Sequence, residues 1–156
     1  MTIHPPAVEF FKRLVALFIV ATSLNFPWEI SQAFLFEGMD STQALVWHCF
    51  VAALGDGVMV WLIYLVGWAA FGQTDWFVRP CRKQYGVMLG TGLVLAIAVE
   101  WVAVYQLQRW AYTGQMPMIS GLGIGLTPVL QMLLLPPLIF YGVGRWRGPK
   151  TRLTGP

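Results

Sequence analysis

The chain has 156 residues, of which 57% are hydrophobic and 11% are charged, and its mean hydropathy is +0.63. Soluble domains carry about a quarter charged residues, so this composition excludes an ordinary soluble domain and favours an integral membrane protein. The net charge of +3 comes without a basic patch interleaved with exposed aromatic residues, so no nucleic-acid partner is expected.

Four apolar stretches are long enough to cross a bilayer, which takes about 20 residues of helix. They cover approximately residues 11–36, 44–71, 85–105 and 119–144. The short loops between them join antiparallel neighbours. The sequence therefore predicts an all-α integral membrane fold, with residues 1–156 forming a single transmembrane domain that is an antiparallel four-transmembrane-helix bundle.

The first stretch has an alternative interpretation. Lys12 and Arg13 followed by apolar residues 14–24 are typical of a signal peptide, and residues 21–23 offer a weak cleavage site. Apolar character continues from Phe26 to residue 36, which a cleaved signal does not need. We therefore expect this segment to remain as a helix.

Basic residues predict the orientation. Nine of the ten Lys and Arg residues fall on one side of the predicted bundle, and Arg109 falls on the other. The nine are Lys12, Arg13, Arg79, Arg82, Lys83, Arg145, Arg147, Lys150 and Arg152. By the positive-inside rule, this side and both termini are cytoplasmic, and we expect the protein in the bacterial inner (plasma) membrane.

Glycine and tryptophan spacing predicts how the helices pack. Gly86 and Gly90 are four residues apart, as are Gly121 and Gly125, a spacing that lets helix backbones touch in lipid. We expect residues 121–125 to open the fourth helix as a flexible entry into the membrane. Four tryptophans near predicted helix ends are expected to be interfacial anchors, namely Trp47, Trp76, Trp110 and Trp146.

The two cysteines predict neither a disulfide nor a metal site. Cys49 and Cys81 fall on opposite sides of the predicted membrane, so they cannot pair within one chain. No CxxC motif or Cys/His cluster is present, and no cofactor or metal is expected.

Three of the seven acidic residues, Glu29, Asp56 and Glu100, lie inside the apolar stretches. A charge at the bilayer centre costs at least about 2.5–3.5 kcal/mol, so such side chains usually face the bundle interior. Counting a rise of about 1.5 Å per residue places all three between the middle and the outer half of the membrane.

Other polar residues fall at a similar depth. Asn25 and Gln32 share a helix face with Glu29, Thr127 and Gln131 share a face of the fourth helix, and His48 enters the second helix near its outer end. Every predicted helix thus contributes to one polar layer, and the cytoplasmic half has no comparable set.

The polar layer has a structural and a functional interpretation. Amides in a membrane bundle can simply hydrogen-bond one another, at about 0.6 kcal/mol each, and an interfacial histidine needs no ligand. Three buried carboxyl groups without a buried cation are harder to explain in this way. Burial and like charge favour the neutral form, so we expect at least one to be protonated at neutral pH. A neutral acid beside an ionised one suits acid/base catalysis, a proton relay or a cation site.

The string Leu24-Asn25-Phe26-Pro27-Trp28-Glu29 contains an Asn-x-x-Trp-Glu pattern. It resembles a motif of the small integral-membrane terpene cyclases of meroterpenoid and indole-diterpene pathways. The resemblance implies that Glu29 is the acid that protonates a prenyl chain, with Asp56 or Glu100 as a second acid. It covers about a dozen residues, and those cyclases usually have seven helices, unlike the four expected here.

A second string joins Glu100-Trp101 to Arg109-Trp110-Ala111-Tyr112 and Met116-Pro117. It is similar to small bacterial membrane proteins with the same acid, Trp-x-Tyr and Met-Pro arrangement, and more distantly to carotenoid-type cyclases. These resemblances fit the chemistry, because a carboxyl group can protonate an isoprenoid and tryptophan faces stabilise the resulting cation.

The first functional hypothesis is a membrane-embedded acid/base enzyme, a cyclase or isomerase, acting on an isoprenoid-like or other lipophilic small molecule. Glu29 and Glu100 form its acid/base pair and Asp56 is the partner carboxylate. The candidate substrate-binding residues are Asn25, Trp28, Trp101, Gln131, Tyr105 and His48. Two alternatives stay open: a small transporter that carries protons or a cation, and an accessory subunit of a membrane complex. The expected partners are membrane lipids, with a homo-oligomer or a partner membrane protein also open.

Overall fold

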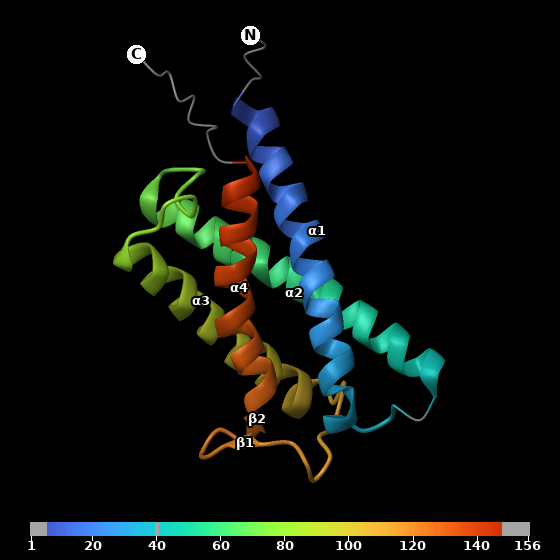
Figure 1. Cartoon of the computed structure of the whole chain (residues 1–156). Coiled ribbons are helices and arrows are strands. Elements are labelled where there is room, and N and C mark those ends of the chain that lie inside the picture. The colour runs from blue at the N-terminus through green and yellow to red at the C-terminus, as the bar shows by residue number, and fades with distance from the viewer. Residues whose placement is uncertain (1–5, 40, 148–156) are drawn as a thin grey trace, which may run out of the picture.

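The computed structural model describes residues 6–39 and 41–147, and it is almost entirely helical (Figure 1). Its helices are α1 (Pro6–Gln32), α2 (Thr42–Phe71), α3 (Arg82–Trp101) and α4 (Leu126–Arg147). A short 3-10 turn, η1 (Ala33–Leu35), follows α1, and a π-helical turn, η2 (Val102–Gln106), continues α3. Two short strands, β1 (Met118–Ile119) and β2 (Ile124–Gly125), form an antiparallel hairpin before α4. The all-helical prediction is confirmed.

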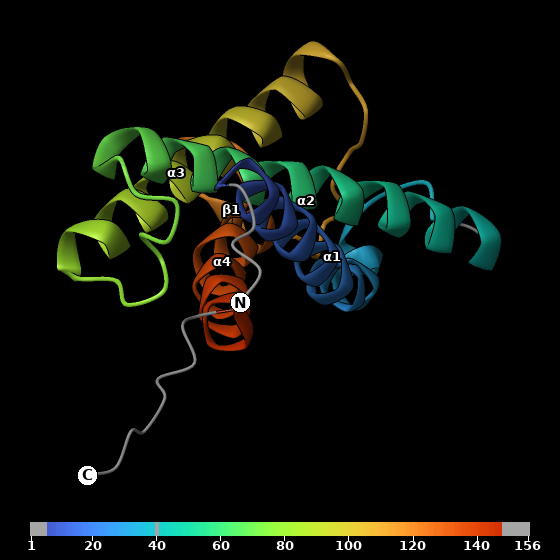
Figure 2. The same cartoon turned by 90° about the horizontal axis from the view of Figure 1, so that it is seen from above.

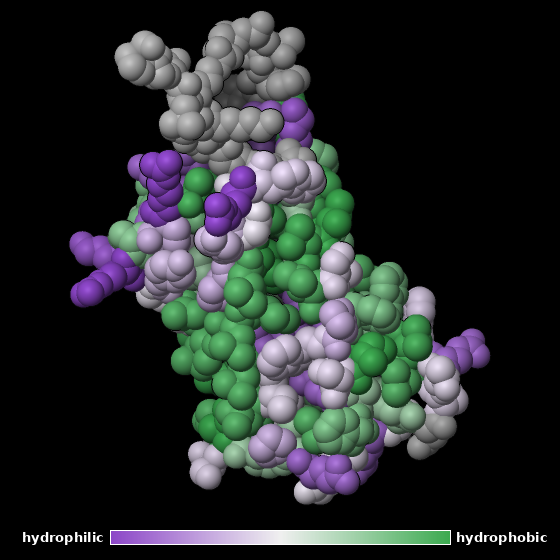
Figure 3. All heavy atoms as spheres, viewed as in Figure 1, coloured by the Kyte–Doolittle hydropathy of each residue, from purple (hydrophilic) through white to green (hydrophobic). Residues whose placement is uncertain are grey.

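Three segments are long and apolar enough to cross a membrane: Thr42–Phe71, Arg82–Gln106 and Leu126–Trp146, of 30, 25 and 21 residues. Figure 3 shows hydrophobic side chains over the middle of the bundle and hydrophilic ones gathered near its ends. This surface and these lengths are those of a membrane protein.

The most extensive helix contacts form a ring: α1 packs against α2 and α4, and α3 packs against α2 and α4. The chain direction alternates from helix to helix, so α1 begins and α4 ends at the same end of the bundle (Figure 1). Figure 2 shows α2 lying across the bundle, with its N-terminal half extending past α1. The predicted cytoplasmic residues Lys150 and Arg152 lie outside the described part of the chain.

The helix ends follow local sequence signals. The Ser41 hydroxyl accepts a hydrogen bond from the backbone N–H of Ala44 and caps α2, which ends at Gly72 in the left-handed conformation (φ 68°). The prediction that the fourth helix begins at residue 119 is wrong. Gly121 and Gly123 have φ values of 83° and 65°, so they turn the chain into the hairpin and delay α4 until Leu126.

The apolar core fills the end of the bundle where the chain begins and ends. Its most buried members include Leu17, Val60, Ile63, Ile139 and Phe140. The prediction that Trp76 is an interfacial anchor is wrong, because this side chain is 1% exposed in the core. The loop after α2 folds back, and the Trp76 indole N–H donates to the carbonyl of Tyr64 at 3.2 Å.

The close helix contacts occur at glycines other than the predicted pairs. A Cβ added at Gly86 or Gly90 meets nothing within 4 Å, so this pair makes no close packing contact. A Cβ at Gly57 would lie 2.8 Å from the Phe18 ring of α1, and one at Gly92 would lie 2.6 Å from the carbonyl oxygen of Met132 in α4. The spacing of four residues therefore did not identify the packed faces.

Candidate functional site

Part of the polar layer expected from the sequence is present: side chains of α1, α2 and α4 meet around Gln131. The other expected members, Glu100 of α3, His48 and Thr127, have hydrogen-bond partners outside this group. Nε2 of Gln131 donates to Oδ1 of Asn25 at 2.8 Å and to Oδ2 of Asp56 at 2.7 Å. Its Oε1 accepts from Nε2 of Gln32 at 3.1 Å. Because Gln131 is only 2% exposed, one buried amide joins three helices through all of its polar atoms.

Glu29 completes this network from α1. Nε2 of Gln32 donates to Glu29 Oε1 at 3.0 Å, and the Trp28 indole N–H donates to Gln32 Oε1 at 3.3 Å. The carboxyl groups of Glu29 and Asp56 are also close enough to interact electrostatically. Glu29, Gln32, Gln131 and Asp56 therefore form a closed ring of polar contacts, which we call the carboxyl ring.

The carboxyl ring contains two acidic residues and no basic residue. Within residues 6–39 and 41–147, no Lys or Arg side chain forms an ion pair with Glu29, Asp56 or Glu100. The two acids also differ in access, because Asp56 is 8% exposed whereas Glu29 is only partly buried. The site therefore holds two neighbouring carboxyl groups without a cation, with Glu29 closer to the surface.

The third acid, Glu100, has separate partners. It lies at the end of α3, is 5% exposed, and accepts from the Tyr112 hydroxyl and, at 3.4 Å, from the Trp110 indole N–H. Burial, and then the hydrogen bond to Glu100, raise the pKa of Tyr112, so this phenol stays a proton donor. Glu100 is close enough to Glu29 and Asp56 to interact with them electrostatically.

The loop that carries Tyr112 is tied to the turn after α1. The backbone N–H of Glu37 donates to the carbonyl of Ala111, and the N–H of Thr113 donates to the carbonyl of Leu35, both at 2.9 Å. These bonds join the loop to the turn after α1 at the end of the bundle where α3 carries Glu100. The π-helical turn η2, a feature often found at functional sites, lies between Glu100 and this loop.

Three of the predicted substrate-binding residues lie apart from this network. Trp101 and Tyr105 are 47% and 49% exposed, and the Tyr105 hydroxyl donates to the carbonyl of Gly123 at 2.7 Å. His48 is exposed, and its Nδ1 lies 2.8 Å from the carbonyl oxygen of Ala44. Asn25 and Gln131 are hydrogen-bonded to each other, and Trp28 reaches the ring through Gln32.

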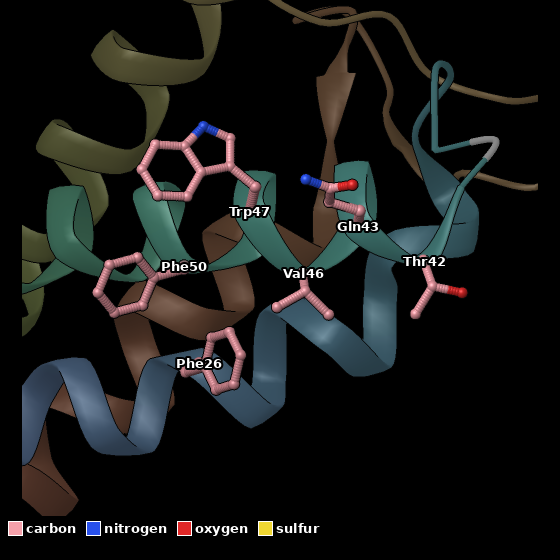
Figure 4. Close-up of a pocket in the computed structure, with 6 residues that line it drawn as sticks. All are labelled: Phe26, Thr42, Gln43, Val46, Trp47 and Phe50. Atoms are coloured by element: carbon pink, nitrogen blue, oxygen red, sulfur yellow. The ribbon is translucent and has the colours of Figure 1, made fainter.

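Sequence analysis did not single out a groove between α1 and the N-terminal half of α2. Figure 4 shows the six residues that line this groove of about 670 Å³: Phe26, Thr42, Gln43, Val46, Trp47 and Phe50. The Phe50 ring lies 6.3 Å from the rings of both Phe26 and Trp47.

The groove neighbours the carboxyl ring. Phe26 is one helical turn from Glu29 on α1, and Cys49, next to Phe50, interacts electrostatically with Glu29. An enzyme that encloses its substrate would have a tapered cavity at the level of Glu29 and Glu100. The groove is open at the side of the bundle instead.

Both cysteines are free, with Cys49 buried and Cys81 exposed. In the part of the chain that the structure describes, no cluster of three or more His, Cys, Asp or Glu side chains is arranged to hold a metal ion. Comparison with protein families, with curated proteins and with solved structures finds no match to this chain.

Proposed function

We propose that this chain is an integral membrane enzyme with four transmembrane helices and cytoplasmic termini, and that it carries out acid/base chemistry on an isoprenoid-like lipid. Two observations support the topology. At 27 residues, α1 is long enough to span a bilayer beside the other three helices. The first and last helices have their chain ends at the same end of the bundle, where nine of the ten basic residues fall in the sequence.

The observation that carries the proposed chemistry is the pairing of Glu29 with Asp56 in a buried ring without a cation. Two carboxyl groups that share a proton provide an acid and a base in one site. Glu29, the acid nearer the groove, is assigned the role of proton donor, and Asp56 that of its partner. Gln131 and Gln32 hold the two groups in place, which preorganises the site before a substrate arrives. This assignment replaces Glu100 with Asp56 as the partner of Glu29.

The proposed reaction needs no oxidant or cofactor. The Glu29 carboxyl proton adds to one carbon of a C=C bond and leaves a carbocation on its neighbour. Loss of a proton from an adjacent carbon to a carboxylate then forms a new C=C bond and restores the acid. Aromatic rings stabilise such a cation, and the groove beside Glu29 offers Phe26, Trp47 and Phe50. The resemblance of residues 25–29 to membrane terpene cyclases agrees with this chemistry.

The other two hypotheses have less support from the structure. A transporter needs a polar route past Asp56 toward the cytoplasmic end, and the described core there is made of apolar residues and Tyr64. An accessory subunit would direct its acids outward to a partner, whereas Asp56 and Glu100 are buried against partners in their own chain.

The test is deuterium incorporation. Purified protein in lipid nanodiscs in D2O is incubated with a panel of isoprenoids, and the recovered lipids are measured by mass spectrometry. Protonation of a double bond by an exchangeable acid leaves deuterium on carbon, so wild type is expected to label its substrate. We expect Glu29→Gln and Asp56→Asn to lower the rate by at least about 100-fold, the usual contribution of a general acid.

Glu37→Gln is the matched control, because Glu37 is an exposed glutamate after α1 and its variant should retain the wild-type rate. Wild-type protein that leaves the whole panel undeuterated, or a Glu29→Gln variant that labels as fast as wild type, contradicts the proposed function.

A further inference from the structure

The groove between α1 and α2 has two chemically different ends. Figure 4 shows the rings of Phe26, Trp47 and Phe50 gathered at one end, with Thr42 at the other and Gln43 between them and Thr42. Residues 42–50 cover roughly 12 Å of helix at 1.5 Å per residue, which is enough for a short length of lipid chain. An amphiphile fits this division, with its chain on the aromatic end and its head at Thr42 and Gln43.

The polar end carries hydrogen-bonding groups without charge. Thr42 and Gln43 are exposed, and neither side chain forms a hydrogen bond among the residues that the structure describes. Both offer donors and acceptors to a hydroxyl group. The groove lining contains no Lys or Arg, the side chains that usually bind phosphate.

The charges around this end offset each other. The first turn of α2 presents the positive end of a helix dipole, which favours an anion. The segment between α1 and α2 carries Glu37 and no basic residue in the sequence, and Glu29 lies on the neighbouring face of α1, which together disfavour an anion. A neutral head avoids both the cost of burying a charge and the repulsion from these acids.

From these features we infer that the groove binds one isoprenoid chain whose head is an uncharged hydroxyl group, and that it excludes phosphate and diphosphate esters of the same chain. The inference deepens the proposed function by naming the substrate class. The aromatic end places the chain, and therefore its double bonds, beside Glu29, while the hydroxyl head stays at Thr42 and Gln43.

The experiment is photolabelling of the protein in nanodiscs with a diazirine derivative of farnesol, followed by peptide mapping. We expect labels in the peptides that contain Phe26 and residues 42–50. Unlabelled farnesol should compete, and farnesyl phosphate should compete at least about tenfold more weakly, a difference of about 1.4 kcal/mol in binding free energy.

Two variants sharpen the test. Gln43→Arg adds a cation at the polar end and should improve competition by farnesyl phosphate by about tenfold. Gln73→Arg is the matched control, since it adds the same charge at an exposed glutamine just beyond the opposite end of α2 and should change neither competitor. Val46→Trp, at a position that is already 44% exposed, fills the groove and should abolish the labelling.

Labels that map elsewhere in the bundle, or equal competition by farnesyl phosphate in wild type, would each overturn the inference. The Glu29→Gln variant distinguishes the inferred binding site from the proposed function. That variant should still be labelled at residues 42–50 even though it no longer deuterates the substrate. If the protein is labelled at residues 42–50 but deuterates no isoprenoid, the binding site is supported and the proposed function is contradicted. If it deuterates an isoprenoid but is not labelled there, the proposed function is supported and the binding site is contradicted.

Discussion

Replacing Gln131 with leucine tests whether the carboxyl ring holds α1, α2 and α4 together. The substitution keeps a side chain of similar size and removes three interhelical hydrogen bonds, to Asn25, Asp56 and Gln32. Hydrogen bonds between membrane helices contribute about 0.6 kcal/mol on average, so three give about 2 kcal/mol. The loss should exceed this average, because the acceptor on Asp56 is a buried carboxyl group that keeps no other amide donor.

The assay is the free energy of unfolding in mixed micelles, measured by SDS titration. Gln131→Leu should destabilise the protein by about 2–3 kcal/mol, while Gln106→Leu, at an exposed glutamine at the end of η2, should change it by less than about 0.5 kcal/mol. A double-mutant cycle with Asn25→Leu should show coupling of about 0.6 kcal/mol or more. If Gln131→Leu is as stable as wild type and the cycle shows no coupling, the hydrogen-bonded ring is not the arrangement that holds these helices.

Three further predictions follow from the packing, the loop and the topology. Gly92→Ala should destabilise the protein by about 1–3 kcal/mol, because its Cβ would meet a carbonyl of α4 at 2.6 Å. The control Gly90→Ala, on the open face, should be neutral or stabilising by up to about 1 kcal/mol. Equal effects of the two substitutions on the free energy of unfolding would contradict the α3–α4 contact. Tyr112→Phe removes the hydroxyl donor to the buried acid at the end of α3 and should speed hydrogen exchange at the backbone amides of residues 37 and 113, with Tyr85→Phe, an exposed tyrosine, as the unaffected control. The backbone N–H groups at the start of α3 hold the pKa of the exposed Cys81 below its usual value, so its maleimide labelling should level off at lower pH than that of a free thiol. A membrane-impermeant maleimide should reach Cys81 only from the cytoplasmic side. Labelling from the outside would reverse the proposed topology.

The sequence predicted the helical class and the polar layer because both depend on local and strong signals. Long apolar stretches have few alternatives to helix in a membrane, since lipid cannot satisfy exposed backbone groups. Exposure to lipid is costly for the side chains of Glu29, Asp56 and Gln131, so these side chains are expected to meet in the interior of the bundle. Depth along each helix was therefore enough to predict that these side chains lie in one layer.

Pairing within the layer was not predictable from depth. The rotation of each helix decides which side chains meet, and this rotation depends on small-residue contacts such as those at Gly57 and Gly92. For this reason Glu100 was expected to pair with Glu29, whereas Tyr112 from the following loop is its hydrogen-bond partner. Trp76 was misplaced for a related reason. Position near a helix end indicates an interfacial residue only when the loop does not fold back into the core.

The hydrogen bonds between the turn after α1 and the loop that carries Tyr112 bear on how the kinetics of the proposed enzyme would be measured. They tie this loop to the turn after α1 at one end of the bundle, while the groove opens sideways between α1 and α2. A substrate that enters through that side is supplied by the bilayer and not by the surrounding water. Its rate would then depend on the mole fraction of substrate in the lipid, and diluting the membrane with inert phospholipid would slow turnover at constant bulk concentration. A Michaelis constant for such an enzyme would be expressed per lipid, as a surface quantity.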